Sequence, residues 1–230
     1  MAVARQETRK VTGSSLADQA YNLLKERIIW NHFPGGFQIL EDELALRLQM
    51  SRTPLREALV RLHNEGLVHL IPRHGVWVVP LSIDDVHEIY QVLTSLETTA
   101  AELLAVKKPN DKEVAGLRNA SERMKAALKN DDLDAWVRAD EEFHRLLVGQ
   151  CGNARLANAA RTFLDQSHRV RMVTLRLRDK PVKSTEYHAA LVEAIADGNS
   201  RLARKIHTQQ KGTWRDDMLD LMKKYNIHQF

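Results

Sequence analysis

The stretch SRTPLREALVRLHNEG, residues 51–66, has the pattern of a short amphipathic helix. Leu55, Leu59 and Leu62 recur at helical spacing and form one apolar stripe. Gly66 follows at a position where helices often end, because glycine adopts the left-handed conformation without strain. We therefore expect a helix that buries its leucines against its own domain.

The opposite face of this helix is basic. Thr53 before Pro54 suggests an N-cap followed by proline at the first helical position, and Ser51 is an alternative cap. Arg52, Thr53 and Arg56 lie mostly off the apolar stripe. Taken alone, two arginines one turn apart usually belong to a solvated surface, so the neighbouring elements must settle the interpretation.

Those neighbours predict a helix-turn-helix with a wing. Residues 15–28 have helical periodicity, and LEDELALRLQM (residues 40–50) is typical of a short helix with acids in its first turn. After the stretch come LVHLI and VWVV, two β-forming runs separated by PRHG. The order helix, helix, helix, strand, strand is that of a winged helix-turn-helix.

In that arrangement the basic face would lie in the major groove of DNA. Arginine can hold guanine through two hydrogen bonds or clamp a phosphate, and a helix N-terminus also favours phosphate. Arg73 and His74 fall at the tip of the hairpin, and Gly75 would let the backbone approach the DNA closely. We therefore expect these residues to contact double-stranded DNA.

Composition is consistent with this interpretation and narrows the class of protein. The 230 residues carry a net charge of +4 with 43% hydrophobic residues, which suits a folded protein with a polyanionic partner. The single cysteine indicates a reducing compartment. No signal peptide or membrane-length apolar run is present, so we expect a cytoplasmic protein that does not associate with membranes.

From residue 81 onward the sequence predicts only helices. The fold class expected is therefore mainly α, an N-terminal winged helix-turn-helix with a short β-hairpin followed by an all-α helical bundle. We expect a flexible basic arm at 1–13, a DNA-binding domain at 14–80 and a helical domain at 81–230. The expected helices of that domain span residues 82–106, 110–129, 132–150, 153–177, 184–197 and 200–225.

A possible metal site lies in the helical part. Asp140 and His144 are four residues apart, on one face of a helix, and His188 lies on a later helix. A carboxylate and imidazoles from facing helices can hold a divalent metal. On spacing alone, an exposed ion pair and an unrelated core histidine are the stronger interpretation.

The segment LEDELALRLQMSRTPLREALVRLHNEGLVHLIPRHGVWV closely resembles the winged helix of the GntR family of bacterial transcription regulators. The resemblance implies DNA contacts from Arg52, Thr53, Arg56, His74 and Gly75. Asp42 stands where one member of the family has a DNA-contacting arginine, so we expect no phosphate contact from that position.

The helical half resembles the FCD effector domain of the FadR-type branch, through ADEEFHRLLVGQCGNARL and STEYHAALVEAIADGNSRLA. That domain commonly holds a metal of the Zn, Ni or Mn class with one Asp and three His. Asp140, His144 and His188 match the first three ligands, but Gln210 stands at the fourth and His207 lies one turn earlier. A three-residue site with water, a weakened site and an empty pocket all remain open.

The expected effector pocket also departs from the family. Leu93 replaces an arginine that helps to hold acidic ligands, so Leu93 and Gln210 make a small organic acid less suitable and favour a less charged effector. The run HRVRMVTLRLRDKPVK is usually a solvated face, although some of its arginines could face the pocket and replace the lost cation. These are Arg169, Arg171, Arg176 and Arg178.

The function predicted is an effector-responsive, sequence-specific transcription regulator, a repressor that binds a palindromic operator as a homodimer. We expect no enzymatic activity. One rival is a metal-dependent hydrolase, but the chain has no His-Glu-x-x-His motif and no nucleophile elbow. The other rival is a non-specific architectural DNA-binding protein, which would show little sequence preference.

Overall fold

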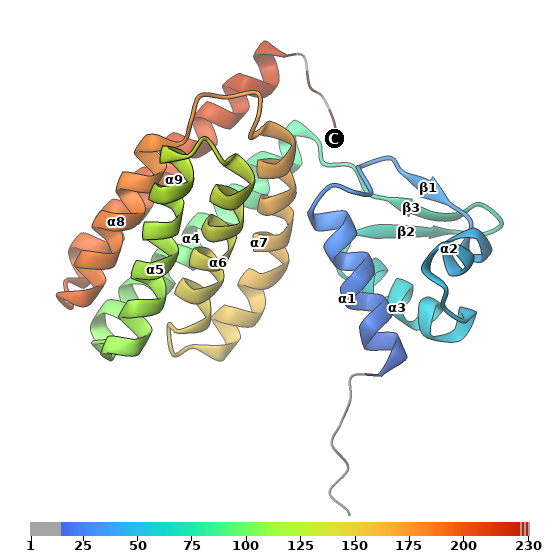
Figure 1. Ribbon diagram of the computed structural model, residues 1–230, viewed down its shortest axis with the longest axis horizontal. Coiled ribbons are helices and arrows are strands. Elements are labelled where there is room, and N and C mark those ends of the chain that lie inside the picture. Colours follow the sequence, from blue (N-terminus) through green and yellow to red (C-terminus); the bar gives the residue numbers. More distant parts are fainter. Residues whose placement is uncertain (1–14, 226, 228, 230) are drawn as a thin grey trace, which may run out of the picture. The chain divides into compact units, whose positions relative to one another are not determined.

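The chain folds into two compact units (Figure 1). The computed structural model describes residues 15–225, 227 and 229, so the expected arm at 1–13 lies outside the described residues. One unit contains residues up to Arg27 together with Phe37–Val78, and the other contains Ile28–Gly36 and the chain from Val79 onward. Each unit has its own buried core and is described by itself.

The N-terminal unit combines short helices with a small sheet. Its elements are α1 (Leu16–Ile29), β1 (Gln38–Ile39), α2 (Glu41–Leu48), α3 (Arg52–Asn64), β2 (Val68–Ile71) and β3 (Gly75–Val78). The strands form one antiparallel sheet in the order β1-β3-β2 (Figure 1). The expected hairpin is present, with Val68 opposite Val78 and Ile71 opposite Gly75. The winged helix-turn-helix expected from the sequence is thereby confirmed.

Strand β1 was missed by the sequence interpretation. It pairs Gln38 with Trp77 and Ile39 with Val76. Two residues are too few to show an alternation of polar and apolar side chains, so only the tertiary partner reveals the strand. Ile39 is buried, and β1 therefore covers the edge of β3 that a simple hairpin would leave unpaired.

Helix α3 begins earlier than its proline suggested. Its N-cap is Ser51, the alternative, and its first helical residue is Arg52, so the placement of Thr53 as N-cap was wrong. Pro54 occupies the third helical position. Proline is tolerated there because the first backbone N–H groups of a helix have no intrahelical partner.

In the described part of the C-terminal unit the regular elements are helices, and one isolated bridge joins Ser82 and Gln229. Its helices are α4 (Ile83–Lys107), α5 (Asp111–Lys129), α6 (Leu133–Gly149), α7 (Ala154–Thr174), α8 (Val182–Ala196) and α9 (Ser200–Lys224). Helix α4 begins with the expected capping box, in which the Ser82 hydroxyl accepts from the Asp85 backbone N–H and the Asp85 carboxylate accepts from the Ser82 N–H.

Helix α4 packs against α6, α7, α8 and α9 and so brings four helices around one interior. Trp136 and Phe143 from α6 are fully buried in that interior. Helix α7 ends at Thr174, three residues before the expected end at 177, and an irregular connection at 175–181 leads into α8. That connection contributes to the site described below.

Candidate functional site

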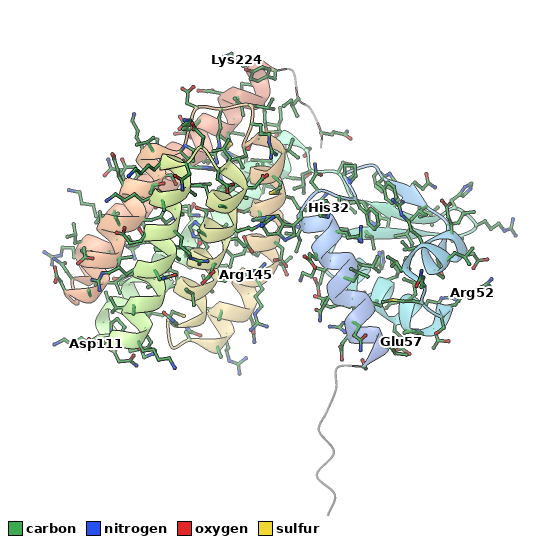
Figure 2. All side chains as sticks on the ribbon, in the orientation of Figure 1. His32, Arg52, Glu57, Asp111, Arg145 and Lys224 are labelled. Carbon is green, nitrogen blue, oxygen red and sulfur yellow. The ribbon has the colours of Figure 1, made fainter. Side chains whose placement is uncertain are left out.

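The basic face expected on α3 is exposed in the N-terminal unit. Arg52, Thr53 and Arg56 are solvent-exposed, and Arg52 extends outward from the start of the helix (Figure 2). Arg73 and His74 are exposed at the turn between β2 and β3. Leu55, Leu59 and Leu62 are at most 1% exposed, so α3 divides into one buried and one open face.

A hollow of about 450 Å³ brings the helix and the wing together. Arg56 from α3 lines it together with Arg73 and Gly75 from the wing and with Glu41 and Asp42 at the start of α2. Arg52 and Thr53 are not part of this lining. A ligand bound in the hollow would therefore contact two arginines from separate elements and two acidic residues.

Asp42 also contacts the basic face directly. Its Oδ2 lies 3.0 Å from Arg52 Nη2, with 61% and 76% of the two side chains exposed. An ion pair this exposed contributes little to stability, since water and salt screen it. The ion pair orients the Arg52 guanidinium, which remains exposed on the surface.

The structure at position 75 requires glycine, because of its backbone conformation and the lack of space for a side chain. Its φ is +81°, and a Cβ there would lie 2.7 Å from Leu40 Cα and closer still to the Ile39 carbonyl oxygen. Gln38, which the sequence interpretation did not single out, donates from Nε2 to the His74 carbonyl oxygen at 2.9 Å. Through this hydrogen bond, strand β1 holds the turn between β2 and β3 in place.

In the C-terminal unit, the residues expected to hold a metal converge. The Nε2 atoms of His144 and His188 are 3.3 Å apart, and each lies 3.6 Å from Asp140 Oδ1. All three side chains are buried, from α6 and α8. Among the described residues they form the group able to share one metal ion. The interpretation as an exposed ion pair, which spacing alone favoured, is wrong, because the face of α6 that carries Asp140 and His144 is buried.

Glu97 on α4 stands behind His144. Its Oε1 lies 2.6 Å from His144 Nδ1, and its Oε2 lies 2.7 Å from the Lys211 ammonium. Burial acts to raise the pKa of Glu97, but His144 and Lys211 hold it well below its ordinary value. A carboxylate on Nδ1 orients the imidazole and leaves Nε2 facing Asp140, which is how metal-binding histidines are commonly supported.

Arg171 on α7 is the corresponding partner of Asp140. Its Nε lies 3.1 Å from Asp140 Oδ2, and its Nη2 lies 3.2 Å from Glu141 Oε2. Burial acts to raise the pKa of Asp140, but Arg171 and His144 lower it below its ordinary value. Of the arginine run, Arg169 and Arg171 are buried, so the solvated-face interpretation is wrong for these two.

Gln210 lies where a fourth ligand would approach. Its Nε2 is 3.4 Å from His188 Nε2 and donates to Ser184 Oγ at 3.3 Å, while its Oε1 is buried without a hydrogen-bond partner. Burial lowers the pKa of His188 to about 3, so its ring stays neutral. His207 is also buried, but its Nε2 faces Glu97 Oε2 at 3.6 Å and it does not join the metal-competent group.

Two hollows lie beside this cluster. The smaller, about 10 Å³, is lined by Asp140, His144 and Gln210 among others. The larger, about 600 Å³, also reaches Gln210. Leu93 lines neither hollow, because it packs in the apolar core with Val148 and Leu164. Of the two residues expected at an effector pocket, the structure therefore brings only Gln210 to these hollows.

The chemistry of the cluster suits a divalent cation. The possible ligands are one carboxylate and two imidazoles that can be neutral. Their ligand atoms lie 3.3–3.6 Å apart, which is the separation expected between tetrahedral ligands of one small ion. The surrounding charges are matched, since Glu97 faces Lys211 and Asp140 faces Arg171. The residues present thus fit a metal, with the orphaned Gln210 oxygen beside it.

A winged helix followed by an all-helical unit defines a class of DNA-binding protein, and comparison with known proteins places this chain in such a class. The model for bacterial regulatory proteins of the gntR family matches residues 16–78, and that for the FCD domain matches residues 88–209. An HTH-type transcriptional regulator from the TAR-I ttuE-ttuC' intergenic region of Agrobacterium vitis is 44% identical over 140 residues, which are 60% of this chain and 82% of that protein.

A second relative, the HTH-type transcriptional regulator YdhC of Bacillus subtilis, is 30% identical over 81% of this chain and 84% of its own. The solved structure of E. coli McbR/YncC has the same fold, with a TM-score of 0.78 at 20% identity over 93% of this chain and 100% of that one. The chain belongs to the GntR family and carries an FCD domain.

The protein is therefore a sequence-specific DNA-binding regulator of transcription, and its family consists of regulators and not of enzymes. None of the helices in the described part of the chain combines the length and apolar character needed to cross a membrane.

Proposed function

We propose that this regulator represses transcription by binding an operator through residues 14–80 and releases it when residues 81–230 bind a small molecule. The observation that carries the DNA-binding part is the open basic surface of α3 and the wing. Arg56, Arg73 and Gly75 line one hollow, and Arg52, Thr53 and His74 are exposed on the same two elements. Arg56 reads a base or a phosphate in the major groove, and the wing contacts the backbone beside it.

The proposed operator is a palindrome, and the proposed binding species is a homodimer that forms through the helical domain. One α3 spans only a few base pairs, which is too little for specific recognition in a genome. Two copies related by a two-fold axis read two half-sites and double the contacts. A change in the spacing between the two recognition helices then suffices to lower operator affinity.

Selection of bound fragments from the source genome, followed by stoichiometry, tests this proposal. Fragments enriched by the full-length protein are expected to share an inverted repeat. Analytical ultracentrifugation with one such duplex should give two chains per duplex. Enriched fragments without a repeat, or one chain per duplex, would contradict the dimer and the palindrome together.

The proposed sensing unit includes a metal site. Asp140, His144 and His188 would hold a cation of the Zn, Ni or Mn class, and Gln210 would complete the set through Oε1 after rotation of its amide. When bound, the metal would link α6, α8 and α9 and offer a positive centre to a ligand. Glu97 orients His144, and Arg171 orients Asp140.

A further inference from the structure

Two consecutive residues of α7, His168 and Arg169, hold the parts of the C-terminal unit at which the chain passes to the N-terminal unit. Both side chains are buried. Residues 28–36 begin in the last turn of α1, and Val79 directly follows β3, yet all of them belong to the C-terminal unit. A contact at either place therefore acts on the chain close in sequence to an element of the N-terminal unit.

Trp30, which directly follows the last residue of α1, is held by His168. The two ring centres are 4.5 Å apart with an angle of 70° between the planes, which is an edge-to-face contact. The Arg138 guanidinium of α6 lies 5.8 Å from the centre of the same indole. Trp30 also packs against the apolar core that contains Trp136 and Phe143. The chain at the end of α1 is therefore tied to α6 and α7.

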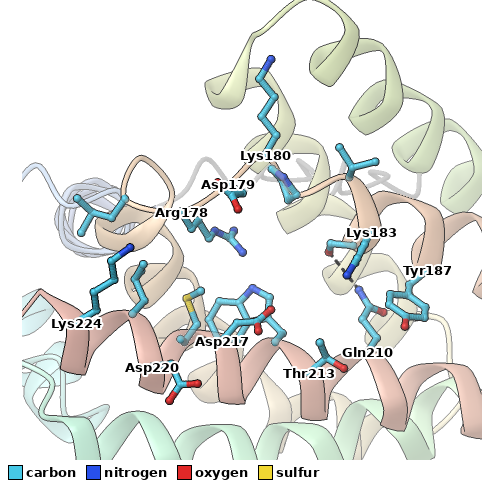
Figure 3. A pocket seen from close by; sticks show the side chains of 17 residues that line it. Arg178, Asp179, Lys180, Lys183, Tyr187, Gln210, Thr213, Asp217, Asp220 and Lys224 are labelled. Carbon is cyan, nitrogen blue, oxygen red and sulfur yellow. Dashed lines mark hydrogen bonds between the residues drawn. The ribbon is translucent and has the colours of Figure 1, made fainter.

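Arg169 holds Val79 by a hydrogen bond. Its Nη2 donates to the Val79 carbonyl oxygen at 2.6 Å, and its Nη1 is buried without a hydrogen-bond partner. Burial lowers the pKa of Arg169 to about 10. By contrast, Arg178 of the same arginine run lines the 600 Å³ hollow together with Asp217 (Figure 3). Arg169 therefore serves the connection between β3 and α4 and not the hollow.

A line of buried charges joins this turn of α7 to the metal-competent cluster. Arg171 Nε lies 3.1 Å from Asp140 Oδ2, and Arg171 Nη2 lies 3.2 Å from Glu141 Oε2. The same oxygen of Glu141 lies 2.8 Å from His168 Nδ1. Burial acts to raise the pKa of Glu141, but His168 and Arg145 lower it to about 2. Glu141 therefore stays ionised and joins Arg171 to the histidine that contacts Trp30.

We propose a relay in which the position of Asp140 determines how firmly His168 holds Trp30 at the end of α1. Its members, in order, are Asp140, Arg171, Glu141, His168 and Trp30. The charged contacts are buried, where a group that loses its partner cannot replace it with water without a large cost. A change at Asp140 therefore displaces Arg171, and Glu141 and His168 follow. As a route for operator release, the relay rests on the proposed function, because only that function links the helical unit to operator binding.

Hydrogen exchange of the full-length protein, measured without metal or DNA, tests the relay. Nearness in space does not by itself show coupling, so the test compares variants. Exchange is followed by mass spectrometry in peptides that cover residues 28–36. Asp140→Asn removes the charge that Arg171 faces. We expect exchange in these peptides to become about fivefold faster or more, because local opening around Trp30 becomes easier.

Two controls separate the relay from a general loss of stability. Asp134→Asn makes the same substitution on α6, in an exposed ion pair with Arg176, and should leave exchange in residues 28–36 unchanged. Peptides of α5 form the internal reference, because α5 also packs against α6 but contributes no member of the relay. In Asp140→Asn, exchange in α5 should change much less than exchange in residues 28–36.

The effect of Asp140→Asn must also disappear when the relay is interrupted. His168→Leu keeps an apolar side chain against Trp30 but removes the link to Glu141. In this background, Asp140→Asn should cause no further increase of exchange in residues 28–36. Glu141→Met interrupts the same route one residue earlier and takes its place if His168→Leu does not fold.

Three results would overturn the relay: unchanged exchange of residues 28–36 in Asp140→Asn, an equal increase in α5, or an undiminished increase in the interrupted background. Operator binding separates this inference from the proposed function. A selective increase of exchange in Asp140→Asn with unchanged operator affinity would contradict the link to release but not the relay. Release of the operator by a small molecule, without any selective effect of Asp140→Asn on exchange, would contradict the relay alone.

Discussion

Gln210 is the residue that sets this chain apart at its metal-competent cluster. An amide oxygen is a weaker ligand than an imidazole nitrogen for zinc-like ions, yet its side chain is buried against His188 with Oε1 unsatisfied. In the proposed metal site, Gln210 would therefore limit how tightly the Asp140–His144–His188 group binds the ion.

Replacing Gln210 by His is expected to raise metal affinity on the order of tenfold or more, because a fourth imidazole completes the set. Competition against a chromophoric chelator measures this, alongside elemental analysis of protein purified without a metal column. Gln209→His is the control, since the neighbouring side chain is exposed and adds the same group outside the cluster. Equal affinities for both variants and the wild type would refute the proposed role of Gln210.

The candidate metal ligands could be predicted from spacing and resemblance, but the charged residues that contact and orient them could not. Glu97, Arg171 and Lys211 come from three helices and meet only because those helices pack together. In the sequence, each is one charged residue among many. Arg178 shows the same limit, since a run of arginines indicates a solvated face until the fold places two indoles around one of them.

At the scale of elements, α3 and the β2–β3 hairpin were predictable because their leucine spacing and β-forming runs are local signals. Strand β1 and the start of α3 were not. Two residues carry no periodicity, and the proline of α3 is compatible with more than one position in the first turn. The wing therefore depends on a strand that only the tertiary structure reveals.

That dependence predicts a difference between two glycines with positive φ. Gly75→Ala and Gly66→Ala both strain the backbone, by about 1–3 kcal/mol each. Only Gly75 would also push a Cβ into β1, whereas nothing lies within 4 Å of a Cβ at Gly66. We expect Gly75→Ala to lower the free energy of unfolding by about 1–3 kcal/mol more than Gly66→Ala. Equal losses in urea titrations would show that β1 does not constrain the wing.

At the scale of the whole molecule, one chain combines an open basic surface in one unit with a closed, charge-balanced interior in the other. The first suits a polyanion that is read from outside, and the second, whose buried ligand atoms lie beside a hollow of only about 10 Å³, suits an ion. In the proposed function, the first unit would bind the operator and the second would bind the effector.

The central claim is that α3 reads a specific DNA sequence. The most direct measurement is fluorescence anisotropy at one fixed salt concentration, comparing a selected operator with a scrambled duplex of equal length. We expect the operator to bind roughly 10³-fold tighter or more, and Arg52→Ala or Arg56→Ala to weaken operator binding by about 1–3 kcal/mol. Arg123→Ala, an exposed arginine paired with Glu142 on the helical unit, should have no effect. Equal affinity for both duplexes, or unchanged operator binding in both α3 variants, would contradict the account.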